Sequence, residues 1–139
     1  MVQTVLEVMT PHPVVLAPDD TATEAARVMR ERNIGDVIVM DHDQLWGIVT
    51  DRDIVVRALA DGRDANTVQL VEICSRHLTG IEPSATTDDA IRAMREQALR
   101  RLPVIEDGCP IGVVSIGDIA IERDPGSALA DVSAAPPNT

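Results

Sequence analysis

Two short stretches of the sequence combine residue types that suit either helix capping or ligand binding. Residues 47–53 read GIVTDRD and residues 112–118 read GVVSIGD, so each has an apolar run, a hydroxyl residue and, three residues later, an aspartate. A hydroxyl at a helix start satisfies free backbone N–H groups, and the aspartate complements the helix dipole. The same groups also suit a nucleotide, because N–H groups bind a phosphate and a carboxylate accepts hydrogen bonds from a ribose diol. Spacing alone leaves both interpretations open for Thr50, Asp53, Ser115 and Asp118.

The sequence shows no pattern typical of catalysis or of metal binding. His12 and His77 lack the spacing of a zinc site, so we interpret them as turn residues and expect no metal. We recognise no nucleophile with a base and an orienting acid. Cys74 and Cys109 are too few for a disulfide framework, and we expect both to be reduced thiols. The sequence therefore favours a protein that is not an enzyme.

The two stretches, which we call the closing motifs, belong to an internal repeat. An offset of 65 positions aligns residues 29–31 with residues 94–96, both of which read MRE, and places Asp53 opposite Asp118. The register continues without a gap over a whole unit. Chance would not maintain one register over this length, so we expect two copies of one structural unit.

Each copy has the same order of expected elements. An extended segment leads into an amphipathic helix with a capping pair, Thr21 with Glu24 in the first copy and Thr86 with Asp89 in the second. Two apolar runs separated by a polar turn then predict a hairpin, and a second helix follows. The expected ranges are 13–16, 22–29, 37–49 and 51–60 in the first copy, and 78–81, 90–98, 102–114 and 116–123 in the second.

The expected fold is α/β (α+β), with tandem β-α-β-β-α repeats packed as a pseudo-two-fold pair. One copy alone buries too little surface to be stable. We place the first repeat at 8–60, a linker with a short helix at 61–72, and the second repeat at 73–123, so that the pair occupies 1–123. Residues 124–139 lose periodicity and gain proline and small residues, which predicts a flexible tail.

Composition and charge exclude several classes of partner. The net charge of −11 repels phosphate backbones and anionic lipids, and Trp46 is the only aromatic residue available to stack on a base. We therefore expect neither a nucleic acid nor a membrane as partner. The chain has no apolar stretch of the ~20 residues that span a bilayer, and its N-terminus does not resemble a signal peptide. The expected location is the cytoplasm.

The repeated order of elements, closed in each copy by G-h-h-[T/S]-x-x-D (h apolar), resembles the cystathionine-β-synthase (CBS) domain pair, or Bateman module. The resemblance covers about Val8 to Arg123. Residues 7–11 (EVMTP) resemble the opening motif of the family, and residues 102–105 (LPVI) resemble its second strand. Residues 33–35 (NIG) together with residues 50–55 (TDRDIV) look closest to small stand-alone actinobacterial members of the family.

The resemblance implies a pair of clefts between the copies that bind AMP, ATP or another adenosyl ligand, with no required cofactor. In the family, the hydroxyl and aspartate of the closing motif hold phosphate and ribose. Apolar side chains and backbone groups of the opening segment and the second strand hold the base. The matching positions are Thr10, Pro11, Val14, Ile34, Asp36 and Ile38 in the first copy, and Leu78, Thr79, Leu99, Arg101 and Pro103 in the second.

The two copies differ in charge where the second strand begins. Arg100 and Arg101 precede this strand in copy two, whereas Asp36 aligns with Arg101 in copy one and would repel a phosphate. The copy-one strand also has Ile38 where copy two keeps the family's Pro103. The arginines fit a phosphate site or a solvated, dimer-facing pair equally well. Of the two closing motifs, we assign the second to these arginines.

Two functional hypotheses follow. The first is a regulatory, nucleotide-sensing CBS pair whose ligand shifts the packing of the copies or of two protomers. The alternative is a stand-alone interaction or structural protein that has lost the ligand, which Asp36 and the negative charge favour. In either case we expect a homodimer and a protein partner that the sequence does not name. The apolar faces of the closing helices are the expected contact, with Ile54, Val55, Ala58 and Ile119.

Overall fold

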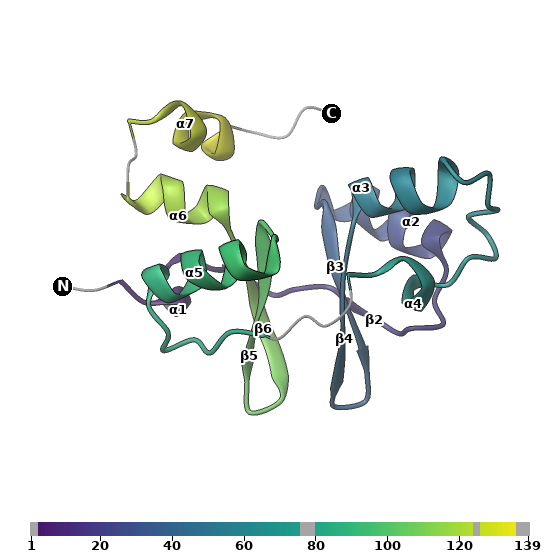
Figure 1. The fold of residues 1–139 in the computed structure, drawn as a ribbon, viewed down its shortest axis with the longest axis horizontal. Coiled ribbons are helices and arrows are strands. Elements are labelled where there is room, and N and C mark those ends of the chain that lie inside the picture. Colours follow the sequence, from purple (N-terminus) through teal and green to yellow (C-terminus); the bar gives the residue numbers. More distant parts are fainter. Residues whose placement is uncertain (1–2, 76–79, 124–125, 136–139) are drawn as a thin grey trace. The chain divides into compact units, whose positions relative to one another are not determined.

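The computed structural model describes residues 3–75, 80–123 and 126–135 (Figure 1). The chain separates into two compact units. The first-repeat unit is Val14–Thr79, and the second-repeat unit combines Met1–Pro13 with Gly80–Thr139. The beginning of the chain thus belongs to the unit formed by the second repeat.

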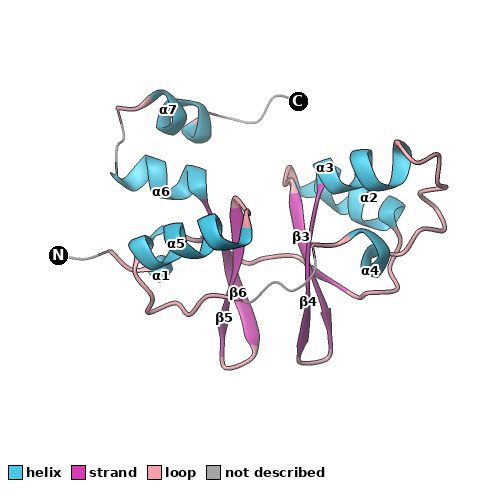
Figure 2. Ribbon diagram, viewed as in Figure 1, coloured by secondary structure: helices cyan, strands magenta, loops and turns pink. Residues whose placement is uncertain are grey.

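The first-repeat unit is a three-stranded sheet with helices packed against it (Figure 2). The strands lie in the order β2-β3-β4, with β2 parallel to β3 and β3 antiparallel to β4. Its elements are β2 (Val15–Leu16), α2 (Ala22–Arg32), β3 (Asp36–Asp41), β4 (Gln44–Thr50), α3 (Asp51–Ile54), the π-helical η1 (Val55–Leu59) that continues α3, and α4 (Leu70–Ile73).

Helix α2 begins where the sequence predicts and continues to Arg32, three residues beyond the expected range. Thr21 Oγ1 accepts from the Glu24 backbone N–H at 3.2 Å, and the Glu24 carboxylate accepts from the Thr21 N–H at 3.4 Å, which completes a capping box. The helix ends at Asn33, whose φ of 54° is left-handed. Its buried residues are Ala22, Ala25 and Met29, which recur at helical spacing. One face of α2 therefore packs on the sheet.

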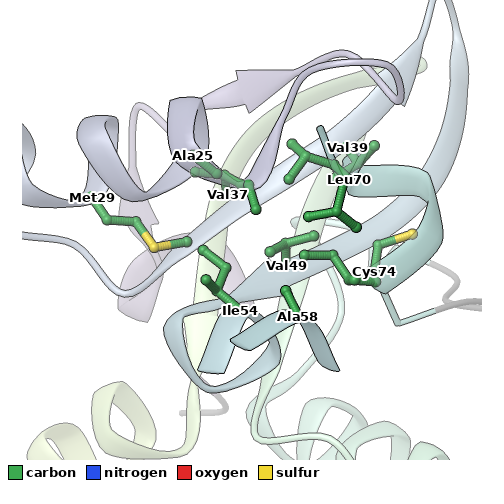
Figure 3. Packing of buried hydrophobic residues seen from close by; sticks show 12 residues of the cluster. Ala25, Met29, Val37, Val39, Val49, Ile54, Ala58, Leu70 and Cys74 are labelled. Carbon is green, nitrogen blue, oxygen red and sulfur yellow. The ribbon is translucent and has the colours of Figure 1, made fainter. Parts of the chain in front are cut away.

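The core of this unit is aliphatic, as an almost aromatic-free composition requires (Figure 3). Strands β3 and β4 contribute Val37, Val39 and Val49, and α4 contributes Leu70. Ile54 and Ala58 also belong to this cluster, with exposed fractions of 7% and 0%. Burial of this apolar surface is the main force that holds the unit together.

The second-repeat unit has the corresponding architecture. Its sheet has the order β1-β6-β5, and both pairings are antiparallel. Its elements are α1 (Val5–Val8), β1 (Thr10–Pro11), α5 (Thr87–Gln97), β5 (Arg101–Glu106), β6 (Cys109–Ser115), α6 (Ile116–Arg123) and α7 (Ala128–Ala134). The β5–β6 register shifts between Val104 and Ile105, and β3–β4 shifts at the matched step between Val39 and Met40. The two hairpins therefore repeat even in their irregularity.

The structure replaces the expected irregular tail with a helix over part of its length. Ser127 caps α7 by accepting from the Ala130 N–H at 3.0 Å, and Ala130 is 2% exposed. The segment is rich in alanine, the strongest helix former, and it has a serine cap. Because its buried contact is made through small residues, hydrophobic periodicity does not reveal it.

The expected dimer face is wrong for three of its four residues. Ile54, Ala58 and Ile119 are buried within their own units, at 7%, 0% and 4% exposed. Within their own units, α3 packs against α2 and β4, and α6 packs against β6, α1 and α7. Val55 is 55% exposed, together with Val56 and Leu59 on the same π-helical turn.

Candidate functional site

The second closing motif forms a reciprocal cap where β6 enters α6. The Asp118 N–H donates to Ser115 Oγ at 3.0 Å, and the Ser115 N–H donates to Asp118 Oδ2 at 2.9 Å. The capping interpretation of the motif is therefore confirmed. It does not exclude ligand binding, because Asp118 keeps a second carboxylate oxygen and Ser115 keeps its hydroxyl proton.

Arg101 lies beside this cap. Strand β5 pairs with β6 so that Arg101 is opposite Ser115, and the positive charge of Arg101 acts to lower the pKa of Asp118. The backbone carbonyl of Arg100 accepts from the Ile116 N–H at 3.0 Å, which fixes the strand against the start of α6. Arg100 is exposed, whereas Arg101 is half-buried. Arg101 is therefore the arginine that the fold brings to the second closing motif.

Thr10 reaches the same cap from the other end of the sequence. Strand β1 pairs antiparallel with β6, with Thr10 opposite Val113 and Pro11 opposite Gly112. The Thr10 hydroxyl interacts with the Asp118 carboxyl and acts to lower its pKa. Thr10 and Pro11 belong to the first copy in sequence, but in the structure both lie in the second-repeat unit.

Burial dominates the electrostatics of Asp118. It raises the pKa of the carboxyl above its ordinary value of 3.8, because a carboxylate loses hydration when it is removed from water. Hydrogen bonds from Ser115 and Thr10 and the charge of Arg101 offset part of this effect. The structure thus holds a partly dehydrated carboxyl among donors. Further donors from a ligand would favour its charged form.

The first closing motif has the same cap and different neighbours. The Asp53 N–H donates to Thr50 Oγ1 at 3.1 Å, and the Thr50 N–H donates to Asp53 Oδ2 at 2.8 Å. The residue opposite Thr50 on β3 is Asp36, at the position where Arg101 faces Ser115 in the other unit. The remaining oxygen of Asp53 lies 3.8 Å from Arg57 Nε. The free carboxylate oxygen of this motif thus already has a cation close by.

Arg57 also connects this cap to the end of α4. Its Nη1 donates to the carbonyl oxygens of Ile73 at 3.3 Å and Cys74 at 3.4 Å. Cations stabilise a helix C-terminus, where carbonyl groups lack partners. The residue that matches Arg57 in the second repeat is Glu122, which cannot donate to carbonyl groups. Charge is therefore reversed at two matched positions, Asp36 with Arg101 and Arg57 with Glu122.

Ser75 is a site residue that the sequence analysis missed. The 65-residue offset pairs it with Thr10, and the structure gives it the same place in the other unit. Its N–H donates to the Ile48 carbonyl at 3.0 Å, as an isolated antiparallel bridge beside β4. The repeat register alone would have found Ser75. Each unit thus takes its opening segment from the other repeat.

The other expected site residues divide between the two units. In the first-repeat unit, the Val14 carbonyl accepts from the Ile38 N–H at 2.9 Å, and Ile34 packs against the core. In the second-repeat unit, Leu99 is half-buried at the end of α5, and Pro103 is buried in β5. Leu78 and Thr79 lie outside the described residues, as does His77.

The part of the chain that the structure describes contains no group of three or more His, Cys, Asp or Glu side chains that could hold a metal ion. Within the same residues, no helix has the length and apolar character needed to cross a membrane. Both cysteines are thiols, with Cys74 buried and Cys109 exposed.

The two closing motifs and the duplicated fold agree with a comparison against protein families. The CBS domain model matches residues 5–59 and again 70–123. The chain belongs to the CBS domain family and carries two of its repeats.

Relatives of this chain support the assignment over most of its length. CBS domain-containing protein YhcV of Bacillus subtilis is 35% identical over 133 residues, which is 93% of this chain and 94% of the relative. Hypoxic response protein 1 of Mycobacterium tuberculosis is 39% identical over 102 residues, 73% of this chain and 71% of that protein. Its crystal structure, which holds two coordinated zinc ions, matches with a TM-score of 0.75 at 34% identity, covering 85% of this chain and 97% of that chain.

A second solved structure is that of a CBS domain pair with bound ligands. The CBS domain pair of protein MJ0100, in complex with 5′-methylthioadenosine and S-adenosyl-L-methionine, matches with a TM-score of 0.79 over 91% of this chain and 100% of that chain. At 23% identity this similarity concerns the fold alone.

Proposed function

We propose that this protein is a regulatory, ligand-sensing CBS pair that binds an adenosine nucleotide or a related adenosyl ligand at the second closing motif. One observation carries the proposal: Thr10, Arg101 and Ser115 all surround the partly dehydrated carboxyl of Asp118. An acceptor, two hydroxyl groups and a cation within one unit complement a ribose diol and a phosphate. The MJ0100 complex supports adenosyl ligands as the class to test.

Each polar group has a distinct part in this site. The Asp118 oxygen that the cap does not use accepts from the ribose hydroxyls. The hydroxyl proton of Ser115 is donated to the phosphate, since its oxygen already accepts from the Asp118 N–H. Arg101 supplies the positive charge that offsets the desolvation of the phosphate. Hydrogen bonds to charged groups of this kind contribute about 1.5–3 kcal/mol each.

The position of Thr10 suggests how binding is transmitted. Thr10 lies on β1, and the chain continues from β1 through Pro13 into the first-repeat unit at Val14. A ligand that draws Asp118 and Thr10 together also fixes this connection. The regulatory output is then a change in how the connection is held, and no reaction is catalysed.

Titration calorimetry with AMP, ATP and S-adenosylmethionine, together with thermal denaturation, tests this function. We expect at least one of these ligands to bind and to raise the melting temperature. Asp118→Ala should weaken this binding, and Asp43→Ala, in the exposed turn between β3 and β4, is the matched control because it removes an aspartate away from the caps. If none of the three gives heat or a thermal shift at millimolar concentration, ligand sensing is wrong.

The first closing motif favours a second candidate function, a stand-alone interaction or structural dimer without a nucleotide. In that unit Asp53 pairs with Arg57, and Asp36 replaces the phosphate-binding cation. If the second closing motif also binds no nucleotide, the chain forms a dimer and binds none of the three ligands. Ligand titration and sedimentation on the same sample separate the two functions.

We also propose that the protein forms a two-fold homodimer through the exposed turn of η1. Val55, Val56 and Leu59 are 55%, 45% and 56% exposed and lie at helical spacing on one face. Leu59→Glu places a charge in this face, and we expect it to shift the sedimentation mass from dimer toward monomer. A wild-type mass of one chain at every concentration would contradict the dimer.

A further inference from the structure

The C-terminal helix α7 packs on α6, the helix that follows the second closing motif (Figure 1). Both helices belong to the second-repeat unit. Helix α7 directs Ala130, its buried residue, into this contact and leaves Leu129 and Val132 exposed at 47% and 74%. Its contact face is therefore its small-residue face, which permits a close approach between the two helix backbones.

Helix α7 comes close to α6 at Gly117, inside the closing motif. A Cβ placed on Gly117 would lie 2.6 Å from Ser133 Oγ, 3.1 Å from Ser133 Cβ and 3.6 Å from Ser115 Oγ. A side chain at position 117 would therefore collide with Ser133 of α7 unless that serine moved. The hydroxyls of Ser133 and Ser115 thus both lie around the place that a residue-117 side chain would occupy.

The first repeat shows what this place holds when α7 is absent. The residue that matches Gly117 is Arg52, an exposed polar side chain in the first turn of α3. In the first repeat the motif itself supplies a donor immediately before its aspartate. In the second repeat the motif has no donor side chain at this position, and Ser133 of α7 places a hydroxyl there instead.

We infer that Ser133 is a further ligand-contacting residue of the second-repeat site, where its hydroxyl donates to the phosphate of the bound nucleotide beside Ser115. The inference rests on the function proposed above. Ser133 forms no hydrogen bond with any residue that the structure describes, so its donor proton is available. Helix α7, which lies outside both matched ranges of the family model, thereby becomes part of the site.

Titration of AMP and adenosine into the full-length chain and two variants tests the assignment. Ser133→Ala removes the hydroxyl and retains α7, because alanine is the stronger helix former. Val132→Ala is the matched control, since its side chain faces solvent on the same turn. A neutral hydrogen bond contributes roughly 0.5–1.5 kcal/mol, so we expect Ser133→Ala to weaken AMP binding about 2- to 10-fold. Adenosine, which lacks the phosphate, should bind both variants as it binds the wild type.

The outcomes separate this inference from the proposed function. Equal AMP affinity for Ser133→Ala and wild type overturns the role of Ser133 and leaves the proposed function intact. An equal loss for AMP and adenosine also overturns it, because the hydroxyl then does not act on the phosphate. If the wild type binds neither compound, the proposed function itself is wrong.

Discussion

Alanine substitution of the two glycines that begin the closing motifs tests the exchange of opening segments between the repeats. A Cβ on Gly112 would lie 2.5 Å from Met9 Sδ and 2.7 Å from the Thr10 carbonyl oxygen. A Cβ on Gly47 would overlap the carbonyl oxygen of Ser75. Both glycines are thus required because the opening segment of the other repeat crosses the strand at that position.

The atoms that each added Cβ would contact determine which substitution should destabilise the protein more. At Gly112 the flexible Met9 side chain can move, and the Thr10 carbonyl, at 2.7 Å, must shift by less than the Ser75 carbonyl must at Gly47. At Gly47 the nearest atom is a backbone carbonyl, which cannot move alone. Overpacking costs about 1–3 kcal/mol, so we expect Gly112→Ala near the lower value and Gly47→Ala at or above the upper value.

Urea denaturation followed by circular dichroism measures these free energies of unfolding. Gly126→Ala is the control, because its Cβ would meet no atom within 4 Å. We expect this control to stay within about 0.5 kcal/mol of wild type. Gly112→Ala should also weaken AMP binding, since it displaces Thr10 from Asp118. If all three variants are equally stable, Thr10 and Ser75 do not lie where the structure places them.

Two further predictions concern stability. Ala98 ends α5 in a left-handed conformation with φ of 54°, which costs an alanine about 1–2 kcal/mol. Because glycine adopts this conformation without strain, Ala98→Gly should raise the free energy of unfolding by about 1 kcal/mol. An unchanged or lower value in urea denaturation would contradict this. Asp118→Asn should be more stable than wild type at neutral pH by less than about 1 kcal/mol, because the amide retains the cap without the burial of a charge. The raised pKa of Asp118 means that its stabilising contribution is present below its ordinary value of 3.8 and is lost as pH rises through the folded value. The difference between variant and wild type should therefore grow with pH, and a difference independent of pH would contradict the raised pKa.

The sequence predicts the local structure well, because local structure depends on nearby residues. The caps at Thr21, Thr50 and Ser115 form with the aspartate or glutamate three residues later. The two hairpins lie at the expected positions for a similar reason, since each joins two apolar runs across a short polar turn.

The sequence does not predict which opening segment joins which repeat. Strand β1 has two residues, and its partner β6 lies about a hundred positions away along the chain. No periodicity connects segments at that separation, so Thr10 was assigned to the copy in which it occurs. The offset of 65 could have paired it with Ser75, but not with Asp118.

The sequence does not predict what covers the apolar face of each closing helix, for a related reason. An apolar face at Ile54 and Ala58 indicates that the helix packs against something, without indicating whether this is its own sheet or a second copy. The structure shows that Ile54 and Ala58 pack into the core of their own unit. The hydrophobic pattern does not predict helix α7, because its alanine and serine residues indicate neither a hydrophobic face nor a turn.

The most direct test of the central claim compares the two closing aspartates by calorimetric titration with AMP. Asp118 has Arg101 and Thr10 beside it, whereas Asp53 has Arg57 near its remaining oxygen and Asp36 opposite its cap. We expect Asp118→Ala to weaken binding roughly 10- to 100-fold, the equivalent of one charge-assisted hydrogen bond, and Asp53→Ala to have a much smaller effect. Circular dichroism should show both variants folded. Equal losses in the two variants, or a larger loss in Asp53→Ala, would contradict the assignment of the site to the second closing motif.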